Sequence, residues 1–157
     1  MKQTHNTITT YAVSIGIHLA VGAISAWVNA GNFDIGFLCQ PTLTPPPWIF
    51  PVVWTLLFTL MGVSAAKVYL GGSTERSDAL FLDGVQLIVN FLWTVFFFSF
   101  HALLLCLFWL IFLLLLVILM AVRYARCDAA AGKLQIPYLV WLGFATYLNF
   151  ALWYLNR

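Results

Sequence analysis

Charged residues are scarce in this sequence. Asp, Glu, Lys and Arg make up only 8% of its 157 residues, whereas about 25% is usual in soluble domains. Apolar residues make up 63%, and the mean hydropathy is +0.96. A water-soluble fold of this length cannot bury so much apolar surface, so the composition excludes a soluble protein and indicates an integral membrane protein.

Other absences exclude further classes of function. The net charge of +2 is small and dispersed, so we expect no nucleic-acid partner. Cys39, Cys106 and Cys127 have no metal-like spacing, so we expect free thiols and no metal site, with a Cys39–Cys106 disulfide as the alternative. The sequence has no Ser–His–Asp grouping, no carboxylate pair at membrane depth and no glycine-rich phosphate loop. It therefore shows no apparatus for acid–base catalysis or nucleotide binding.

Five apolar runs are long enough to cross a bilayer, for which a helix needs about 20 residues. They cover residues 8–28, 47–70, 80–100, 103–126 and 134–155. The first run exceeds the roughly 7–15 apolar residues of a signal peptide. We therefore predict an all-α integral membrane protein with one domain over residues 1–157, a bundle of five transmembrane helices.

Lysine and arginine are distributed unequally between the two ends of these helices. With five spans, the N-terminus and the second and fourth connections share one side of the membrane. That side would carry Lys2, Lys67, Arg76, Arg123, Arg126 and Lys133, and the other side would carry only Arg157. Positively charged segments stay in the cytoplasm, so the pattern predicts a cytoplasmic N-terminus and an outside C-terminus.

The proline-rich stretch LTPPPWIFPVVW covers residues 43–54, on the predicted outer side. The first turn of a helix tolerates proline because its N–H groups have no intrahelical acceptor. We therefore expect Thr44 as the N-cap, followed by Pro45, Pro46 and Pro47 in the first turn.

Pro51 lies one turn deeper in this expected helix. It should remove a backbone hydrogen bond and bend the helix, so that Trp54 faces the interior of the bundle. Trp48 has two readings, an interfacial tryptophan of the membrane surface or part of a lid over the interior.

Polar and aromatic residues form one stripe on the third span and another on the fifth. The first stripe consists of Gln86, Asn90, Trp93, Thr94 and Phe97, and the second of Tyr138, Trp141, Ala145, Leu148 and Asn149. Both have the spacing of a single helical face. Amides inside a membrane normally face the protein. The stripes are either clamps between helices or, with Trp54, the walls of a cavity for a flat apolar ligand.

The predicted spans contain several ionisable residues, among them His18, Lys67 and Asp83. His18 is near the middle of the first span, a position that marks a functional candidate. Because it has no partner ligand for iron, a hydrogen-bonded packing histidine is favoured over haem ligation. Lys67 and Asp83 lie near the inner helix ends, where we expect them to reach the membrane surface or to form paired anchors.

The first and fourth spans suggest different packing. Gly16–Ala20 and Gly22–Ala26 are pairs of small residues that fit either packing within the bundle or a contact between two copies. The fourth span is apolar all round. We expect it to face lipid, with Trp109 making no difference to that assignment.

Three segments together resemble the TspO/MBR family, the tryptophan-rich sensory proteins whose eukaryotic members are the translocator proteins or peripheral benzodiazepine receptors. They are LTPPPWIFPVVWTLLFTLMG at 43–62, QLIVNFLWTVFFF at 86–98 and IPYLVWLGFATYLNF at 136–150. Their order and spacing match the family, and with the five spans the resemblance covers nearly the whole chain.

The resemblance implies a five-helix bundle, generally dimeric, with a ligand cavity under the first loop. The implied ligands are porphyrins such as protoporphyrin IX and haem, isoquinoline and benzodiazepine compounds and, in some members, sterols such as cholesterol. No cofactor is implied. The family pocket falls on Trp54, Gln86, Asn90, Trp93, Trp141 and Ala145, beneath a lid and helix start that includes Pro45, Pro46, Trp48 and Pro51.

These features predict a membrane-embedded binding protein or sensor for porphyrins and other flat lipophiles, connected with tetrapyrrole or sterol transport and stress regulation. The bacterial inner and outer membranes are both compatible locations. Two alternatives are a light-dependent porphyrin-degrading enzyme and a transporter. Five spans without an internal repeat do not match the repeated architecture of secondary carriers.

The sequence departs from the family at several positions. The loop has Gln40 and Leu43 where the family pattern has lysine and tryptophan. Val95 replaces a common proline, Ser99 a common glycine, and Phe150 a tyrosine of the sterol motif. A photochemical role carried over from the family would therefore lack its loop tryptophan.

Overall fold

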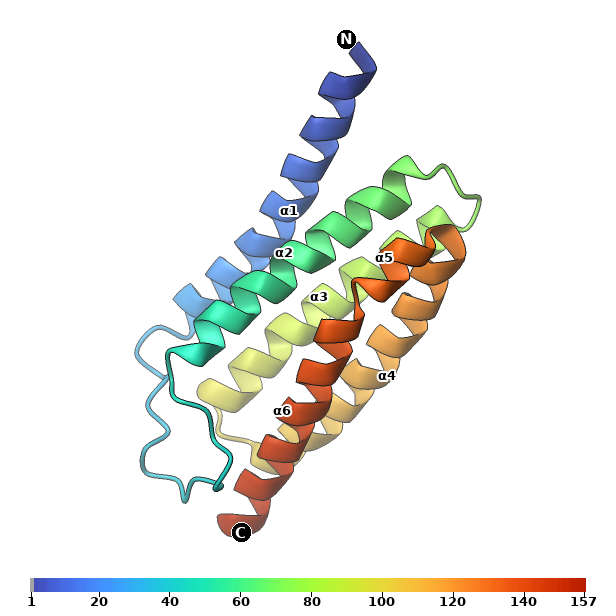
Figure 1. Cartoon of the computed structure of the whole chain (residues 1–157). Coiled ribbons are helices and arrows are strands. Elements are labelled where there is room, and N and C mark those ends of the chain that lie inside the picture. Colours follow the sequence, from blue (N-terminus) through green and yellow to red (C-terminus); the bar gives the residue numbers. More distant parts are fainter. Residues whose placement is uncertain (1) are drawn as a thin grey trace.

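The computed structural model describes residues 2–157, with side chains from Asn6 onward (Figure 1). The helices are α1 (Lys2–Val28), α2 (Ile49–Leu70), α3 (Arg76–Phe98), α4 (Leu103–Cys127), α5 (Ala129–Lys133) and α6 (Ile136–Leu155). Within residues 2–157 there is no strand. The side chain of Lys2, which contributes to the charge asymmetry, lies outside the described part.

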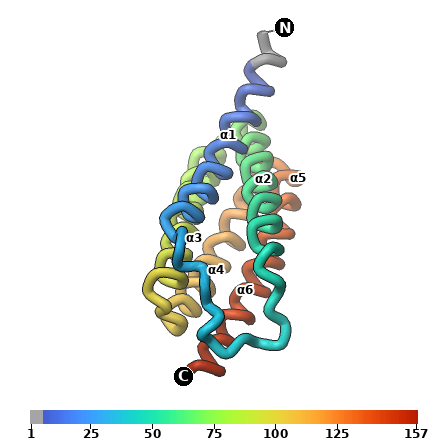
Figure 2. The backbone as a smooth tube through the Cα atoms, turned by 90° about the vertical axis from the view of Figure 1, so that its left-hand side faces the viewer, coloured from blue at the N-terminus to red at the C-terminus, as the bar shows by residue number. Residues whose placement is uncertain are grey.

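Five segments are long and apolar enough to cross a membrane, which confirms the predicted fold class. They are Asn6–Val28, α2, α3, α4 and the stretch Ala129–Leu155, in which α5 and α6 follow one another. The N-terminus lies at one end of the bundle, while the C-terminus and the long α1–α2 loop lie at the other (Figures 1 and 2). α1 packs mainly on α2, whereas α4 packs on α3, α5 and α6.

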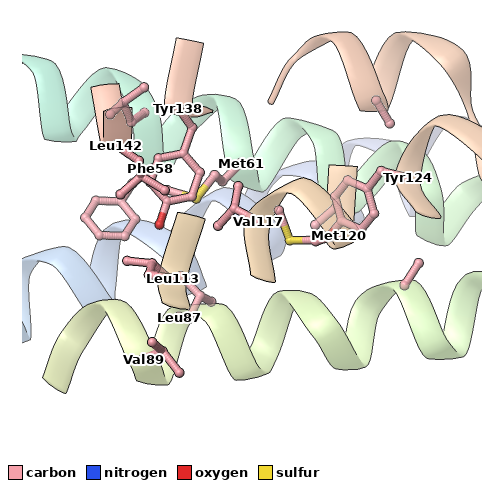
Figure 3. Packing of buried hydrophobic residues seen from close by; sticks show 14 of the residues in the cluster. Phe58, Met61, Leu87, Val89, Leu113, Val117, Met120, Tyr124, Tyr138 and Leu142 are labelled. Atoms are coloured by element: carbon pink, nitrogen blue, oxygen red, sulfur yellow. The ribbon is translucent and has the colours of Figure 1, made fainter. Parts of the chain in front are cut away.

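The assignment of α4 to lipid holds for one side of the helix only, where large apolar residues such as Phe108 and Leu115 are exposed. One face of this helix is almost fully buried, and its residues recur every three or four positions: Cys106, Leu110, Leu113, Val117, Met120 and Tyr124. Figure 3 shows Val117, Met120 and Tyr124 within the hydrophobic core. Trp109 also points into the bundle, because its Nε1–H donates to the Val89 carbonyl at 2.8 Å. A helix that is apolar all round gives no pattern from which the buried face could be identified.

The start of α2 also differs from the expectation. The Thr44 hydroxyl donates to the Pro41 carbonyl at 2.9 Å, and the helix begins only at Ile49, so Thr44 is not its N-cap. Trp48 occupies the N-cap position without a side-chain cap and is 67% exposed. Pro51 is therefore the third residue of the helix, where its missing N–H costs no intrahelical bond. The physical reason for a bend at Pro51 disappears.

Two glycines bring α1 and α2 into close contact. The Ser14 hydroxyl donates to the Gly62 carbonyl at 2.7 Å, and a Cβ atom on Gly62 would lie 2.5 Å from the Ile15 Cα. A Cβ on Gly22 would lie 2.6 Å from the ring of Phe58 in α2. The small residue at position 22 thus serves packing within the bundle.

The long loop is fixed to the end of α6. The Cys39 N–H donates to Asn156 Oδ1 at 2.9 Å, and Asn156 Nδ2 donates back to the Cys39 carbonyl at 3.1 Å. The Phe37 ring also contacts His101, with centroids 5.2 Å apart. Cys39 is an exposed free thiol and Cys106 a buried one, so the alternative disulfide is not formed.

The opposite end of the bundle carries ion pairs. Lys67 Nζ lies 3.2 Å from Asp128 Oδ2, as expected of a paired anchor. Asp128 also caps α5, because its side chain accepts the Ala131 N–H at 2.9 Å. This backbone hydrogen bond, with the nearby Lys67 ammonium, lowers the pKa of Asp128 below its ordinary value.

Candidate functional site

A chain of buried polar side chains crosses the bundle from α6 through α3 to α1. The Tyr138 hydroxyl donates to Gln86 Oε1 at 3.0 Å, and Gln86 Nε2 donates to Asp83 Oδ1 at 3.1 Å. Asp83 Oδ2 then lies 3.1 Å from His18 Nε2, and His18 Nδ1 lies 2.8 Å from the Ser14 carbonyl. The four residues from Tyr138 to His18 are each at most 5% exposed.

The hydrogen-bond partners of these side chains determine which atoms carry a proton. A carbonyl oxygen only accepts, so His18 Nδ1 must carry a hydrogen for the contact with Ser14. His18 Nε2 faces a carboxyl oxygen of Asp83, so that contact also needs a proton. The Gln86 amide donates to the other carboxyl oxygen, Oδ1, so the proton of this contact is shared between His18 Nε2 and Asp83 Oδ2. The pair is therefore neutral as a unit and holds one proton inside the membrane span.

These hydrogen bonds change the interpretation of two residues. His18 is a hydrogen-bonded histidine, as the sequence favoured. Asp83 does not reach the membrane surface, because it is 5% exposed and is held by His18 and Gln86. The signal for this role was present in the sequence, since Asp83 and Gln86 are three residues apart and share a helical face.

The polar stripe on α3 contains two clamps to neighbouring helices. Gln86 clamps α3 to α6 through Tyr138, and Asn29 Nδ2 donates to Thr94 Oγ1 at 3.1 Å from the end of α1. Gln86 and Tyr138 thus belong to the buried core rather than to an open cavity wall. The clamp interpretation therefore holds for Gln86 and for Thr94.

The rest of the α3 stripe has unsatisfied polar groups. Asn90 is 2% exposed, and its Oδ1 has no hydrogen-bond partner among the described residues. One turn further, Trp93 Nε1 is buried and has no acceptor there either. The Trp93 ring stacks on Phe97, with centroids 5.2 Å apart. An acceptor and a donor therefore lie one helical turn apart beside a stacked aromatic pair.

Aromatic side chains link α2 to α6 near the long loop. The ring centroids of Phe50 and Trp141 are 5.9 Å apart, and those of Trp54 and Tyr138 are 6.2 Å apart. Trp54 thus points toward α6, as predicted, although no bend at Pro51 is needed to direct it there. Phe50 was missed by the sequence reasoning, because one phenylalanine among fourteen carries no distinguishing pattern.

The stripe on α6 is divided between two neighbours. Trp141 and Ala145 pack against the main hydrophobic cluster, as Trp54 and Trp93 do. Asn149 Nδ2 donates to the Leu103 carbonyl at the start of α4 at 2.9 Å, while its Oδ1 has no partner among the described residues. Leu148 is 8% exposed. Trp54, Trp141 and Ala145 therefore pack around one core, whereas Phe97 belongs to a second cluster and Asn149 turns toward α4.

Two grooves open on the surface of the bundle beside α1. The larger has a volume of about 450 Å³ and lies between α1, α2 and α3, with His18 and Asp83 in its lining. The smaller, of about 170 Å³, lies between α1 and α3. Neither groove is lined by Trp54, Asn90 or Trp141. Trp54 and Trp141 pack against the main hydrophobic cluster instead.

Comparison with known proteins gives a consistent result along the chain. Residues 13–155 match the model of the TspO/MBR family. The chain is 36% identical to the tryptophan-rich protein TspO of Chlorobaculum tepidum over 154 residues, which covers 95% of this chain and 97% of that protein. It is 34% identical to protein CrtK of Rhodobacter capsulatus, covering 96% and 94%. It is also 35% identical to the human translocator protein over 123 residues, covering 74% and 70%.

Proposed function

The chain belongs to the TspO/MBR family, and on that premise we propose that it binds porphyrins and other flat lipophilic molecules within the membrane. In this proposal the protein is a receptor or sensor, not a catalyst. The ligands are protoporphyrin IX or haem, with sterols as a second lipophilic class.

The observation that carries the proposal is the pair of unsatisfied groups on α3. Buried polar atoms are normally hydrogen-bonded, and leaving one without a partner costs about 1–3 kcal/mol. Asn90 Oδ1 and Trp93 Nε1 are such atoms, one an acceptor and one a donor. A ligand that offers both a donor and an acceptor at its edge would satisfy them. Protoporphyrin IX and haem carry propionate groups at the edge of a flat aromatic ring. A carboxyl oxygen would accept the Trp93 Nε1–H, and a protonated carboxyl group would donate to Asn90 Oδ1.

The aromatic residues between α2 and α6 supply the apolar part of the proposed site. Phe50 and Trp141 face one another edge to face rather than enclosing an empty cavity. Entry of a flat ligand would therefore require rotation of these side chains, after which ring stacking would replace their mutual contact. The loop containing Pro45 and Pro46 leads into α2 at this end and would act as the lid.

Orientation and assembly complete the proposal. Lys67 and Arg123 lie at the same end of the bundle as the N-terminus, and each pairs with an acidic residue there. The excess of basic residues at this end supports a cytoplasmic N-terminus and a lid on the outer side. We propose a homodimer in a bacterial membrane, in line with the family resemblance.

Porphyrin titration of protein in phospholipid nanodiscs tests the proposal. Seven tryptophans provide an intrinsic signal, and binding should quench their fluorescence saturably at one porphyrin per chain. Quenching that rises linearly, as in protein-free nanodiscs with added tryptophan peptide, would show partitioning into lipid only. Illuminating the complex separates binding from degradation, because a receptor returns the porphyrin unchanged. A proteoliposome flux assay similarly separates binding from transport.

A further inference from the structure

We propose that the larger groove beside α1 is a second binding site, specific for lipophilic amines, which bind as ammonium ions in exchange for the proton on the His18–Asp83 pair. The groove opens on the outside of the bundle between α1, α2 and α3. It is separate from the porphyrin site, since it contains neither Trp54 nor Trp141.

The lining of the groove defines the general shape of its ligand. A volume of about 450 Å³ lies within the range of small-molecule sites, roughly 300–1,000 Å³. Most of the wall is apolar and comes from all three helices, including Val13, Ile17, Ala66 and Leu87. Such a wall accepts an alkyl or ring body that reaches the groove from the lipid.

The polar part of the lining defines the head group. Asp83 is the carboxylate of this groove, and His18 lies beside it. A carboxylate in an apolar groove attracts a cation, and an ammonium is a compact charge, unlike the planar guanidinium. The ligand is therefore an amphiphile with an apolar body and a single amine.

Charge balance requires a proton to leave when this ligand binds. An ammonium added to the neutral His18–Asp83 pair would leave a net positive charge in the membrane interior, which is costly. If the proton shared by His18 Nε2 and Asp83 Oδ2 passes to water, the neutral imidazole keeps its Nδ1–H bond to the Ser14 carbonyl. Its Nε2 lone pair and Asp83 Oδ2 then both accept N–H bonds from the ammonium. One cation replaces one proton, and the pair remains neutral.

The other ionisable groups around the pair do not supply this proton. Tyr124 of α4 and Tyr138 of α6 interact electrostatically with Asp83, and Tyr69 of α2 lines the groove. A phenol ordinarily releases its proton only near pH 10. Arg76 lies over the Tyr69 ring at 5.5 Å, and a guanidinium is not a proton donor in proteins. The proton that leaves when the amine binds therefore comes from the His18–Asp83 pair.

Calorimetry on the protein in phosphatidylcholine nanodiscs tests this site. The probes are dodecylammonium, dodecanol and dodecyl sulfate, which share one chain length and differ in head-group charge. We expect saturable binding of one dodecylammonium per chain, with affinity at least roughly tenfold above that of the other two. In two buffers of different ionisation enthalpy, the heats should report release of about one proton per amine bound. Equal affinities for the three probes, or heats independent of the buffer, would overturn the proposal.

Two variants locate the binding. Asp83→Asn should abolish both amine binding and proton release, while Asp78→Asn, an exposed site in the first turn of α3, should change neither.

Gly84→Leu is the second variant, because Gly84 lines the groove and a Cβ there meets no atom within 4 Å. It should block amine binding without disturbing the fold. Unchanged amine binding in Gly84→Leu would contradict the assignment, and porphyrin titration of the same samples reports independently on the first site.

Discussion

His18 Nε2 and Asp83 Oδ2 lie 3.1 Å apart, although the two residues belong to α1 and α3 and both are buried. This pair ties a helix with few other buried residues to the rest of the bundle. Its charges are desolvated, so loss of one partner leaves the other uncompensated.

Replacement of His18 by alanine should therefore destabilise the protein strongly. Loss of one partner of a buried ion pair costs about 3–5 kcal/mol, and the midpoint of thermal unfolding in detergent should fall clearly. Asp78→Asn, which removes an exposed carboxylate from α3, serves as the control and should leave the midpoint unchanged. If both variants unfold at the wild-type temperature, the pair has no structural role.

The contact between α1 and α2 should depend on a single glycine. Gly62→Ala places a Cβ 2.5 Å from the Ile15 backbone, which cannot move aside as a flexible side chain would. We expect a loss of about 1–3 kcal/mol, the usual range for overpacking. Gly143→Ala is the matched control, because a Cβ there meets nothing within 4 Å, and it should be neutral or slightly stabilising. Equal thermal midpoints for the two variants would refute the close approach.

The sequence was most informative where polar residues interrupt apolar helices. The five spans followed from their length and hydropathy, and Trp54 was correctly directed into the bundle. The buried face of α4 could not be identified, because every face of that helix is apolar. Asp83 was misplaced because its distance from a helix end indicates reach to the surface, whereas its partner His18 is 65 residues away in the sequence.

The start of α2 illustrates a different limit. Several prolines in a row are compatible with either a helical first turn or an extended lead into the helix, since proline fits both. In the structure, residues 44–46 precede the helix without regular structure, and a turn closed by the Ile49 N–H donating to the Pro46 carbonyl leads into it. The shift of the N-cap by four residues, from Thr44 to Trp48, changes the consequence assigned to Pro51 but not the direction of Trp54.

Cysteine labelling should report both the topology and the anchoring of the loop. Cys39 is exposed in the loop and Cys106 is buried, so a membrane-impermeant maleimide applied to intact cells should modify Cys39. Asn156→Ala removes its side-chain hydrogen bonds to Cys39, and labelling should become faster as the loop detaches. Asn32→Ala, which removes a long 3.4 Å contact elsewhere in the loop, should have little effect. Labelling of Cys39 only after permeabilisation would reverse the proposed orientation.

Asp128 lies at the end of the bundle opposite the loop, and its contribution to the stability of the fold should be lost in acid. The pKa of Asp128 lies below its ordinary value of 3.8 because of the Ala131 N–H and Lys67. Its contribution to stability is therefore complete above about pH 4 and disappears as the pH falls through the lowered pKa. Asp128→Ala should lose about 1 kcal/mol at neutral pH, the typical worth of a cap. Its thermal midpoint should also depend less on pH below 4 than that of the wild type, and parallel curves would contradict this role.

Porphyrin titration of Trp141→Ala beside Trp27→Ala tests the proposed function most directly. Each variant removes one of seven tryptophans, but Trp141 faces Phe50 between α6 and α2, whereas Trp27 is 77% exposed on α1. Loss of an aromatic wall should weaken porphyrin binding by roughly tenfold, and Trp27→Ala should bind as tightly as the wild type. Equal affinity in all three proteins would contradict a porphyrin site between α2, α3 and α6.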